Sequence, residues 1–506
     1  MLIKLVPQRF SRAVPLLVAA FVLIFLLTAA RLHHGPFLPF NAKEPPPNSS
    51  SKKPEPEARP IHRPKLAPGK CSPEIEFLRR VELGLSDDIV YSRRCVKPVP
   101  EPHHDRYSVA NISRPLITHT TTVNLTSCSH AEFIPCDHLT LQVPPAYPSK
   151  KYDHIIFGVA SNFNRLNDSL APFAHWLAGS GALLVGVVSD AEDPTQSFDL
   201  AALEEAYKAR GVRASFIPPL VKKERPDDPD IAVEVHHFML IRNLLNVTTT
   251  KTKWLSILDD DTFFPSLYPL DQELETYDHN KSLWLGALSD SFGSVKAWGY
   301  MAFGGAGVFI SPPLAKELDP HLEDCIGEAT TITGDGLLRD CIYTRTRTKL
   351  TLVPGLYQHD THGDMSGFFE SGIRPLSVHH WKSWYKAPMP EMAAVTRLCG
   401  DCFLARHRFA EDTLLANGYS ITQYPDGLDN IDLDKMEGTW RNPARPDFDF
   451  SFPPLRDRLS PAQKKSYRLA DVEVTGKGAF RQIYVYKGDV EKDEPDEVVE
   501  LIWEKE

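Results

Sequence analysis

The stretch WLSILDDDTFF at residues 254–264 decides how the rest of the chain is understood. Its mostly apolar first half predicts a buried strand, and Asp259, Asp260 and Asp261 follow directly where that strand ends. Three neighbouring carboxylates raise the cost of ionising one another unless a cation neutralises them. A hard divalent metal ion is the natural partner for such a group.

A second interpretation of this acidic run needs no metal. Runs of aspartate also occur in solvated turns and at the caps of helices. Here the run comes directly after an apolar strand, and open α/β folds bind their ligands at the C-terminal ends of strands. We therefore favour a metal site over a turn.

Strands and helices alternate on both sides of the acidic run. The predicted strands are 154–159, 182–188, 214–217 and 283–288, and the predicted helices are 164–178, 198–210 and 231–245. This alternation predicts an α/β fold with a Rossmann-like, largely parallel sheet of the nucleotide-binding type.

Three further segments carry candidate site residues. Gly304, Gly305 and Gly307 let the backbone approach a ligand closely, although a tight bend in a sheet would also use them. Asp335 stands between two glycines at a predicted helix start, where an N-cap is the alternative role. The loop at 354–364 contributes the imidazole of His359.

The N-terminus predicts a membrane anchor. Residues 13–30 are uncharged and apolar, and three cationic side chains precede them. As a helix these residues span roughly 27 Å, enough for a thin bilayer, and the flanking charges place residues 1–12 in the cytosol. A cleaved signal peptide ending near Ala30 is the alternative. The Pro-rich residues 31–70 predict an extended stem.

The cysteines and sequons fit an oxidising lumen. The sequence has eight cysteines and six Asn-X-Ser/Thr sequons, at Asn48, Asn111, Asn124, Asn167, Asn246 and Asn280. Neighbouring cysteines suggest four candidate disulfides, Cys71–Cys95, Cys128–Cys136, Cys325–Cys341 and Cys399–Cys402, although spacing alone does not fix connectivity. Zinc is a weaker alternative because no second pair completes a tetrahedral set. The net charge of -10 argues against nucleic acid as a partner.

Four motifs occur in a fixed order: LDDDTFF at 258–264, FGGAGVFIS at 303–311, GDGLLRDC at 334–341, and PGLYQHDTHGDMSG at 354–367 with PLSVHHW at 375–381. Together they resemble the Fringe-like branch of glycosyltransferase family 31. The last pair looks most like plant and fungal members, and the resemblance covers roughly residues 152–390.

The resemblance implies a GT-A fold, a UDP-sugar donor, Mn²⁺ or another divalent cation, and inverting transfer of a hexose or N-acetylhexosamine, usually with a β1,3 linkage. It implies that Asp259 and Asp261 hold the metal while Asp260 shapes the site. The glycines of the 303–311 motif would contact the donor, and Asp335 would be the general base. The acceptor would be a glycan or glycoprotein hydroxyl.

Two positions depart from the family pattern. Tyr357 stands where a histidine is common, so the candidate third metal ligand falls on His359, with His362 in reserve. Gly334 stands where a second acidic residue is common. These departures motivate the alternative of a non-catalytic protein that binds a glycan or a partner; a metal-dependent phosphohydrolase is a third alternative.

These inferences predict a single-pass type II Golgi membrane protein with its bulk in the lumen. Residues 71–150 form a disulfide-braced lead-in, 151–390 the GT-A catalytic domain, and 391–506 a small C-terminal extension packed on that domain.

Overall fold

The computed structural model describes residues 71, 75–128, 136–191, 198–221, 231–329, 333–440, 446–474 and 480–504. The predicted cytoplasmic tail, membrane anchor and stem lie outside these residues. Within the described ranges, no helix is long and apolar enough to cross a membrane.

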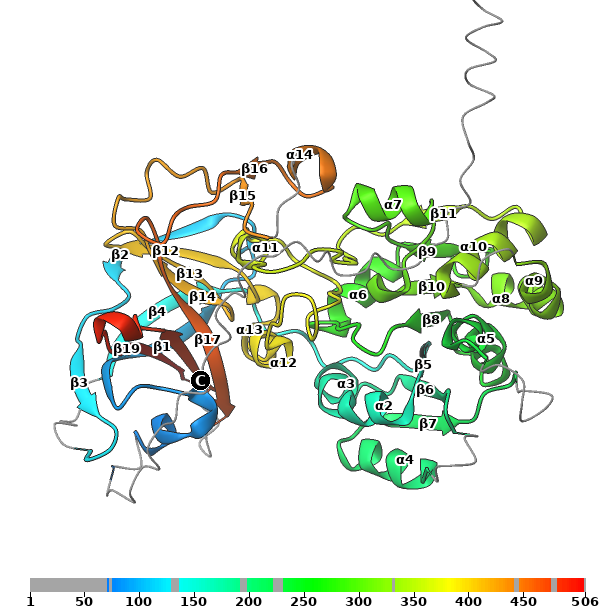
Figure 1. Cartoon of the computed structure of the whole chain (residues 1–506), viewed down its shortest axis with the longest axis horizontal. Coiled ribbons are helices and arrows are strands. Elements are labelled where there is room, and N and C mark those ends of the chain that lie inside the picture. The colour runs from blue at the N-terminus through cyan, green and yellow to red at the C-terminus, as the bar shows by residue number, and fades with distance from the viewer. Residues whose placement is uncertain are drawn as a thin grey trace, which may run out of the picture. The chain divides into compact units, whose positions relative to one another are not determined.

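A seven-stranded sheet carries the acidic run, in the order β11-β9-β10-β8-β5-β6-β7, which the labels in Figure 1 follow. Its strands are β5 (Ile155–Ser161), β6 (Leu183–Val188), β7 (Arg213–Ile217), β8 (Trp254–Leu258), β9 (Trp284–Gly286), β10 (Val308–Ile310) and β11 (Leu350–Leu352). Strands β8, β5, β6 and β7 are parallel, whereas β10 is antiparallel to both β8 and β9. The prediction of a mixed, largely parallel α/β sheet is confirmed.

Helices cover both faces of this sheet. The helices of the region are α2 (Phe163–Asp168), α3 (Leu170–Leu177), α4 (Leu200–Ala209), α5 (Val233–Asn246), α6 (Leu267–Leu274), α7 (Phe292–Trp298), α8 (Pro312–Leu318), α9 (Leu322–Glu328) and α10 (Gly334–Arg345). Side chains of β5 alternate between two cores: Phe157 packs with α2–α4, and Ile156 packs with α5 and α8–α10. The predicted helix 164–178 is two helices that meet at Ser169, whose hydroxyl donates to the Asp260 carbonyl.

A second sheet joins the two ends of the described chain. Its strands are β1 (Asp88–Pro100), β2 (Val109–Pro115), β3 (Thr121–Asn124), β4 (Asp137–Val143), β12 (Arg406–Ala410), β13 (Thr413–Ala416), β14 (Ser420–Gln423), β17 (Lys465–Val474), β18 (Phe480–Tyr486) and β19 (Asp496–Trp503). Strand β1 pairs in parallel with β19, and Figure 1 shows this early and this late strand side by side. Residues 71–150 and 391–506, predicted as separate segments, therefore contribute to one sheet.

Shorter elements complete the described fold. They are β15 (Met436–Glu437), β16 (Leu455–Arg456), α11 (Ser366–Glu370), α12 (Met389–Ala393), α13 (Thr396–Cys399) and α14 (Pro446–Asp449), with 3₁₀ turns at Glu76–Arg79, Val81–Leu83, Gly304–Ala306, Asp319–His321, Gly400–Cys402 and Val490–Lys492.

The structure contains four disulfides, and two of the predicted pairings are wrong. The bonds are Cys71–Cys128, Cys95–Cys136, Cys325–Cys341 and Cys399–Cys402. Strand pairing explains the difference: β4 lies in register beside β1, with His138 opposite Cys95, so the residue just before β4 reaches Cys95. For Cys95, the pairing of β1 with β4 sets the disulfide partner, and nearness in the sequence does not.

Candidate functional site

The acidic run is held at the end of β8 by the aromatic residues that follow it. Phe263 and Phe264 are fully buried, and burial of each such ring contributes roughly 1.5–3 kcal/mol. Thr262 accepts a hydrogen bond from the Asp259 amide at 3.1 Å and donates to the Gly305 carbonyl at 3.0 Å. The carboxylates are therefore fixed against the glycine loop, and the Asp259 side chain remains 39% exposed.

His379 bridges two of the three carboxylates. Its Nε2 lies 3.2 Å from Asp259 Oδ2 and 2.9 Å from Asp261 Oδ1, and its Nδ1 lies 3.2 Å from the Gln358 carbonyl oxygen. That carbonyl accepts the Nδ1 proton and so aims Nε2 at the carboxylates. Asp261, His379 and the adjacent His380 bring potential ligand atoms within 4.8 Å of one another.

Electrostatics tie these groups together. Burial opposes charge on His379, but its bonds to Asp259 and Asp261 outweigh burial and raise the pKa of the imidazole to about 10. Burial likewise opposes charge on Asp259 and Asp261, yet the His379 imidazolium lowers the pKa of both carboxyls. The imidazolium thus occupies the place of the cation that the acidic run requires, and a metal would displace its proton.

Oxygen and imidazole donors of this kind fit Mn²⁺ or a similar divalent ion. Asp259, Asp261 and His379 would hold it, with the Gln358 carbonyl fixing the histidine tautomer.

Asp260 has a different role from its neighbours. Its carboxylate is buried and accepts hydrogen bonds from Ser161 and from two nitrogens of the Arg165 guanidinium. The Asp260 backbone carbonyl also accepts from Ser169 at 2.9 Å. The predicted contribution of Asp260 is therefore to position the run, with its charge already paired.

Asp335 lies at the start of α10 and faces the same space. Its Oδ2 accepts a hydrogen bond from the Gly304 amide at 2.7 Å, and its Oδ1 lies 3.6 Å from His237 Nε2. The other nitrogen of His237 lies 3.9 Å from Asp259 Oδ1. His237 thus stands between the predicted base and the predicted metal ligand, and despite burial these carboxylates raise its pKa.

The glycines leave room for these side chains. A Cβ on Gly304 would lie 2.7 Å from Asp335 Oδ1 and 3.3 Å from Asp259 Oδ1, and one on Gly305 would lie 2.2 Å from the His379 ring. Gly334, which departs from the family pattern, also leaves room for a neighbouring side chain. A Cβ at this position would lie 2.9 Å from the His237 ring. Gly307 has φ +93°, which favours glycine.

The assignment of His359 as third metal ligand needs correction. His359 is fully buried, and its Nδ1 bonds to the Tyr385 hydroxyl at 2.9 Å. Its ring packs edge-on against Phe368, with centroids 4.3 Å apart, and burial lowers its pKa to about 3. His362, the reserve candidate, is exposed and stacks on Trp384. The histidine that faces Asp259 and Asp261 is His379.

We call the group Asp259, Asp261, His237, Asp335 and His379 the acidic-run site. Two of its members, His379 and His237, were not assigned from sequence. His379 belongs to the quoted PLSVHHW motif, and an isolated β-bridge between Phe263 and Val378 brings that motif to the acidic run. His237 lies in the middle of α5 and gives no local signal of its position.

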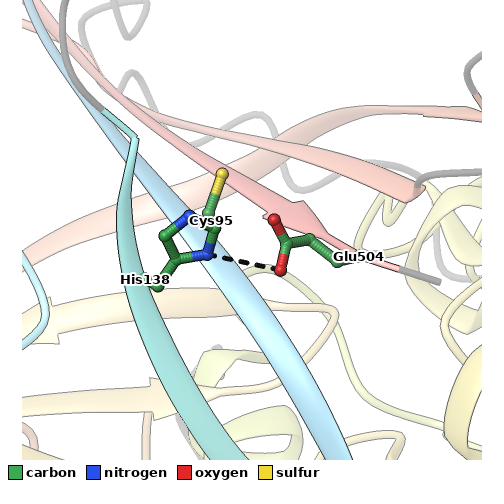
Figure 2. A group of neighbouring side chains, drawn as sticks. All are labelled: Cys95, His138 and Glu504. Carbon is green, nitrogen blue, oxygen red and sulfur yellow. Dashed lines mark ion pairs between the residues drawn. The ribbon is translucent and has the colours of Figure 1, made fainter. Parts of the chain in front are cut away.

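A second group with metal-ligand residue types lies in the other sheet and does not form a site. Cys95, His138 and Glu504 converge there (Figure 2), and His138 Nδ1 lies 3.3 Å from Glu504 Oε2. The Cys95 sulfur is bonded to Cys136, so it offers no thiolate to a metal.

Residues 295–401 match a family model described as "Protein of unknown function, DUF604", and no curated protein matches the chain significantly.

Solved structures with partial likeness include three enzymes. The glycosyltransferase GlyE of Streptococcus pneumoniae TIGR4 is 11% identical, with a TM-score of 0.29 over 49% of this chain and 61% of that one. The mannosyltransferase PcManGT of Pyrobaculum calidifontis, in complex with GDP-Man and Mn²⁺, is 10% identical (TM-score 0.25, 46% and 63%). Mouse xyloside xylosyltransferase 1 is 9% identical (TM-score 0.27, 42% and 88%). The chain spans less than two thirds of the length of the first two.

Proposed function

We propose that this protein is a metal-dependent, inverting glycosyltransferase that transfers a hexose or N-acetylhexosamine from a UDP-sugar to a glycan or glycoprotein hydroxyl. One observation carries the proposal. Asp259, Asp261 and His379 converge at the C-terminal end of β8, and Asp335 faces the same space across Gly304. The sheet end is where open α/β folds bind nucleotides.

The bound metal would act as a Lewis acid that neutralises charge on the departing diphosphate. Asp259 and Asp261 are held in their ionised form by His379, so the carboxylates are ready to bind a cation. The Gln358 carbonyl keeps the His379 Nε2 aimed at them.

Asp335 would act as the base of a single displacement. One oxygen, Oδ2, is fixed by the Gly304 amide, which leaves Oδ1 to accept the proton of the acceptor hydroxyl. As the acceptor oxygen bonds to the anomeric carbon, the bond from this carbon to the UDP oxygen breaks, and the configuration at the anomeric carbon inverts. His237 lies between Asp335 and Asp259, with one ring nitrogen near each carboxylate.

The direct test is sugar transfer by the full chain with Mn²⁺ and a panel of UDP-sugars. Activity that depends on Mn²⁺ and disappears in Asp261→Asn supports the proposal. A chain that shows no Mn²⁺-dependent binding of UDP by calorimetry would instead be the non-catalytic binding protein.

The location is part of the same proposal. An anchor at residues 13–30 would place the site in the Golgi lumen, where four disulfides and glycosylated sequons are stable. Among the sequon asparagines that the structure describes, Asn111, Asn167, Asn246 and Asn280 are exposed, and Asn124 is half-buried. Glycosidase-sensitive mass at these asparagines, protected from protease in sealed Golgi vesicles, is the expected result.

A further inference from the structure

A cavity of about 390 Å³ lies outside the acidic-run site. One wall comes from the second sheet region, through Tyr107, Arg406 and Asp434, and the other includes Glu273 of α6 and Tyr357. None of the residues that line it belongs to the acidic-run site. Its size is within the range of small-molecule sites, which often lie between two packed regions.

The guanidinium of Arg406 is buried in the wall of this cavity. Arg406 is 4% exposed; its terminal nitrogens donate to the carbonyls of Leu433 and Tyr107, but Nε has no hydrogen-bond partner in the described part of the chain. A Cβ on Gly372, which also lines the cavity, would lie 2.4 Å from this Nε. The absence of a side chain at position 372 therefore allows this backbone to pack directly against the guanidinium, which forms a fixed part of the cavity wall.

The lining favours a neutral, hydroxyl-rich ligand. Two arginines, Arg374 and Arg406, are balanced by two carboxylates, Glu273 and Asp434, so the cavity attracts neither anions nor cations strongly. These groups can donate to and accept from hydroxyls. Tyr107 is 56% exposed and offers an aromatic face for the C–H side of a sugar ring. We propose that this cavity binds a neutral oligosaccharide.

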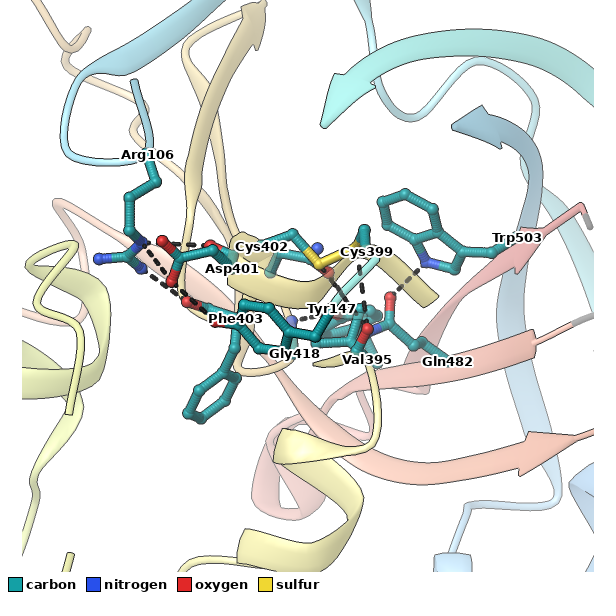
Figure 3. The surroundings of a disulfide bond; sticks show 12 residues. Arg106, Tyr147, Val395, Cys399, Asp401, Cys402, Phe403, Gly418, Gln482 and Trp503 are labelled. Atoms are coloured by element: carbon teal, nitrogen blue, oxygen red, sulfur yellow. Dashed lines mark hydrogen bonds and ion pairs between the residues drawn. A yellow bond between two sulfur atoms is a disulfide. The ribbon is translucent and has the colours of Figure 1, made fainter. Parts of the chain in front are cut away.

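The wall is fixed before any ligand arrives. Asp401, inside the Cys399–Cys402 disulfide loop, accepts hydrogen bonds from Arg374 at 3.1 Å and, through its carbonyl, from Arg106 at 3.2 Å. Arg106 also donates to the Gly372 carbonyl at 2.7 Å, and its guanidinium lies over the Tyr107 ring at 5.1 Å. Figure 3 shows Arg106 and Asp401 beside this disulfide. Such preorganisation lowers the entropy cost of binding.

The cavity adjoins the segments that build the acidic-run site. Tyr357 precedes Gln358, and Leu376 lies three residues before His379; the Tyr357 amide donates to Ser377 at 3.3 Å. A glycan held here would therefore contact the chain that presents His379. The proposal that the cavity binds an oligosaccharide does not rest on the proposed function. If the bound oligosaccharide were the acceptor of the transfer reaction, that further step would rest on it.

The test is saturation-transfer NMR of the full chain with neutral tetrasaccharides of β-linked glucose, galactose or N-acetylglucosamine. EDTA is present and nucleotide is absent, so the acidic-run site binds neither a metal ion nor a sugar nucleotide during the measurement. Tyr107→Ala is expected to weaken binding about tenfold, the loss of one aromatic contact. Asp434→Asn, on an exposed loop, is a second variant that leaves the core untouched and is expected to weaken binding severalfold. Tyr343→Ala, an exposed tyrosine of α10 that does not line the cavity, should bind as wild type.

The proposal is overturned if none of the three tetrasaccharides binds, if both cavity variants bind as well as wild type, or if a sulfated tetrasaccharide binds more tightly than the neutral ones. Asp261→Asn separates the two proposals, because it should abolish transfer while leaving oligosaccharide binding in EDTA intact. Loss of transfer alone therefore does not count against oligosaccharide binding in the cavity. Loss of cavity binding alone does not count against the proposed transferase activity.

Discussion

Two groups of carboxylates and imidazoles receive residues from the same segment, 354–381, and their environments differ. In the acidic-run site, His379 meets two carboxylates and its pKa rises to about 10. In the second group, which we call the Asp290 cluster (Asp290, His359, Asp360 and Tyr385), the His359 ring meets aromatic rings and its pKa falls to about 3.

The carboxylates differ in the same way. Asp259 and Asp261 are kept ionised by imidazolium, whereas Asp290 is buried and accepts a hydrogen bond from the His359 backbone amide, at 2.7 Å. Burial, with the nearby charge of Asp360, raises the pKa of Asp290 to about 7. Residue type alone therefore does not set the pKa of these groups. The neighbours of each ring or carboxylate set it.

The largest effect is expected from the base. Asp335→Asn should lower kcat about 10³-fold, because amide oxygen does not take up the acceptor proton, while UDP affinity with Mn²⁺ changes less than about threefold. Steady-state kinetics and calorimetry measure the two quantities. Equal losses in both would show that Asp335 is only a structural cap for the Gly304 amide.

Matched histidine variants compare the two groups directly. His379→Gln is expected to weaken Mn²⁺ binding about 100-fold, since it removes a donor and the partner of both carboxylates. His359→Gln should bind Mn²⁺ as wild type, although it loses packing against Phe368. Calorimetry with Mn²⁺ and UDP is the measurement. If His359→Gln lost Mn²⁺ affinity and His379→Gln kept it, His359 would be the metal ligand.

Asp290 sets a pH dependence of stability. Its folded pKa of about 7 lies above the ordinary value of 3.8, so its contribution is fully present below about pH 4 and is lost as pH rises through 7. Asp290→Asn should therefore raise the free energy of unfolding by about 2–4 kcal/mol at pH 8 and change it little at pH 4. Urea unfolding in EDTA measures this. Asp87→Asn, at an exposed aspartate of the second sheet region, should show no such gain.

The smallest effect concerns the pairing of Asp260. Arg165→Met removes the guanidinium from a buried carboxylate, but the Arg165 side chain is 61% exposed, so water replaces part of the interaction. We expect a loss of about 1–2 kcal/mol in unfolding free energy. A double-mutant cycle with Asp260→Asn isolates the pair, and additive losses would show that Asp260 does not depend on Arg165.

Much of the fold could be predicted because its signals are local. The apolar run before Asp259 and the alternation of strands and helices follow from side-chain periodicity over a few residues. The division of the predicted helix at Ser169 has no local signal, and the Ser169 hydroxyl bonds there to Asp260, which lies far away in the sequence. The single sheet made from residues 71–150 and 391–506 was missed for the same reason, since β1 and β19 pair across the whole described chain.

By itself the sequence determined where charge gathers: the acidic run at a strand end, the glycines that leave space beside it, and Asp335 at a helix start. Only the tertiary structure decided which imidazole completes the group. His359 and His379 are both loop histidines of one segment, and their local sequences carry no information about what each ring faces. The β-bridge between Phe263 and Val378 turns His379 toward the carboxylates, while packing against Phe368 draws His359 into the core. Such long-range pairing fixes the partner of each ring, and the partner fixes its charge.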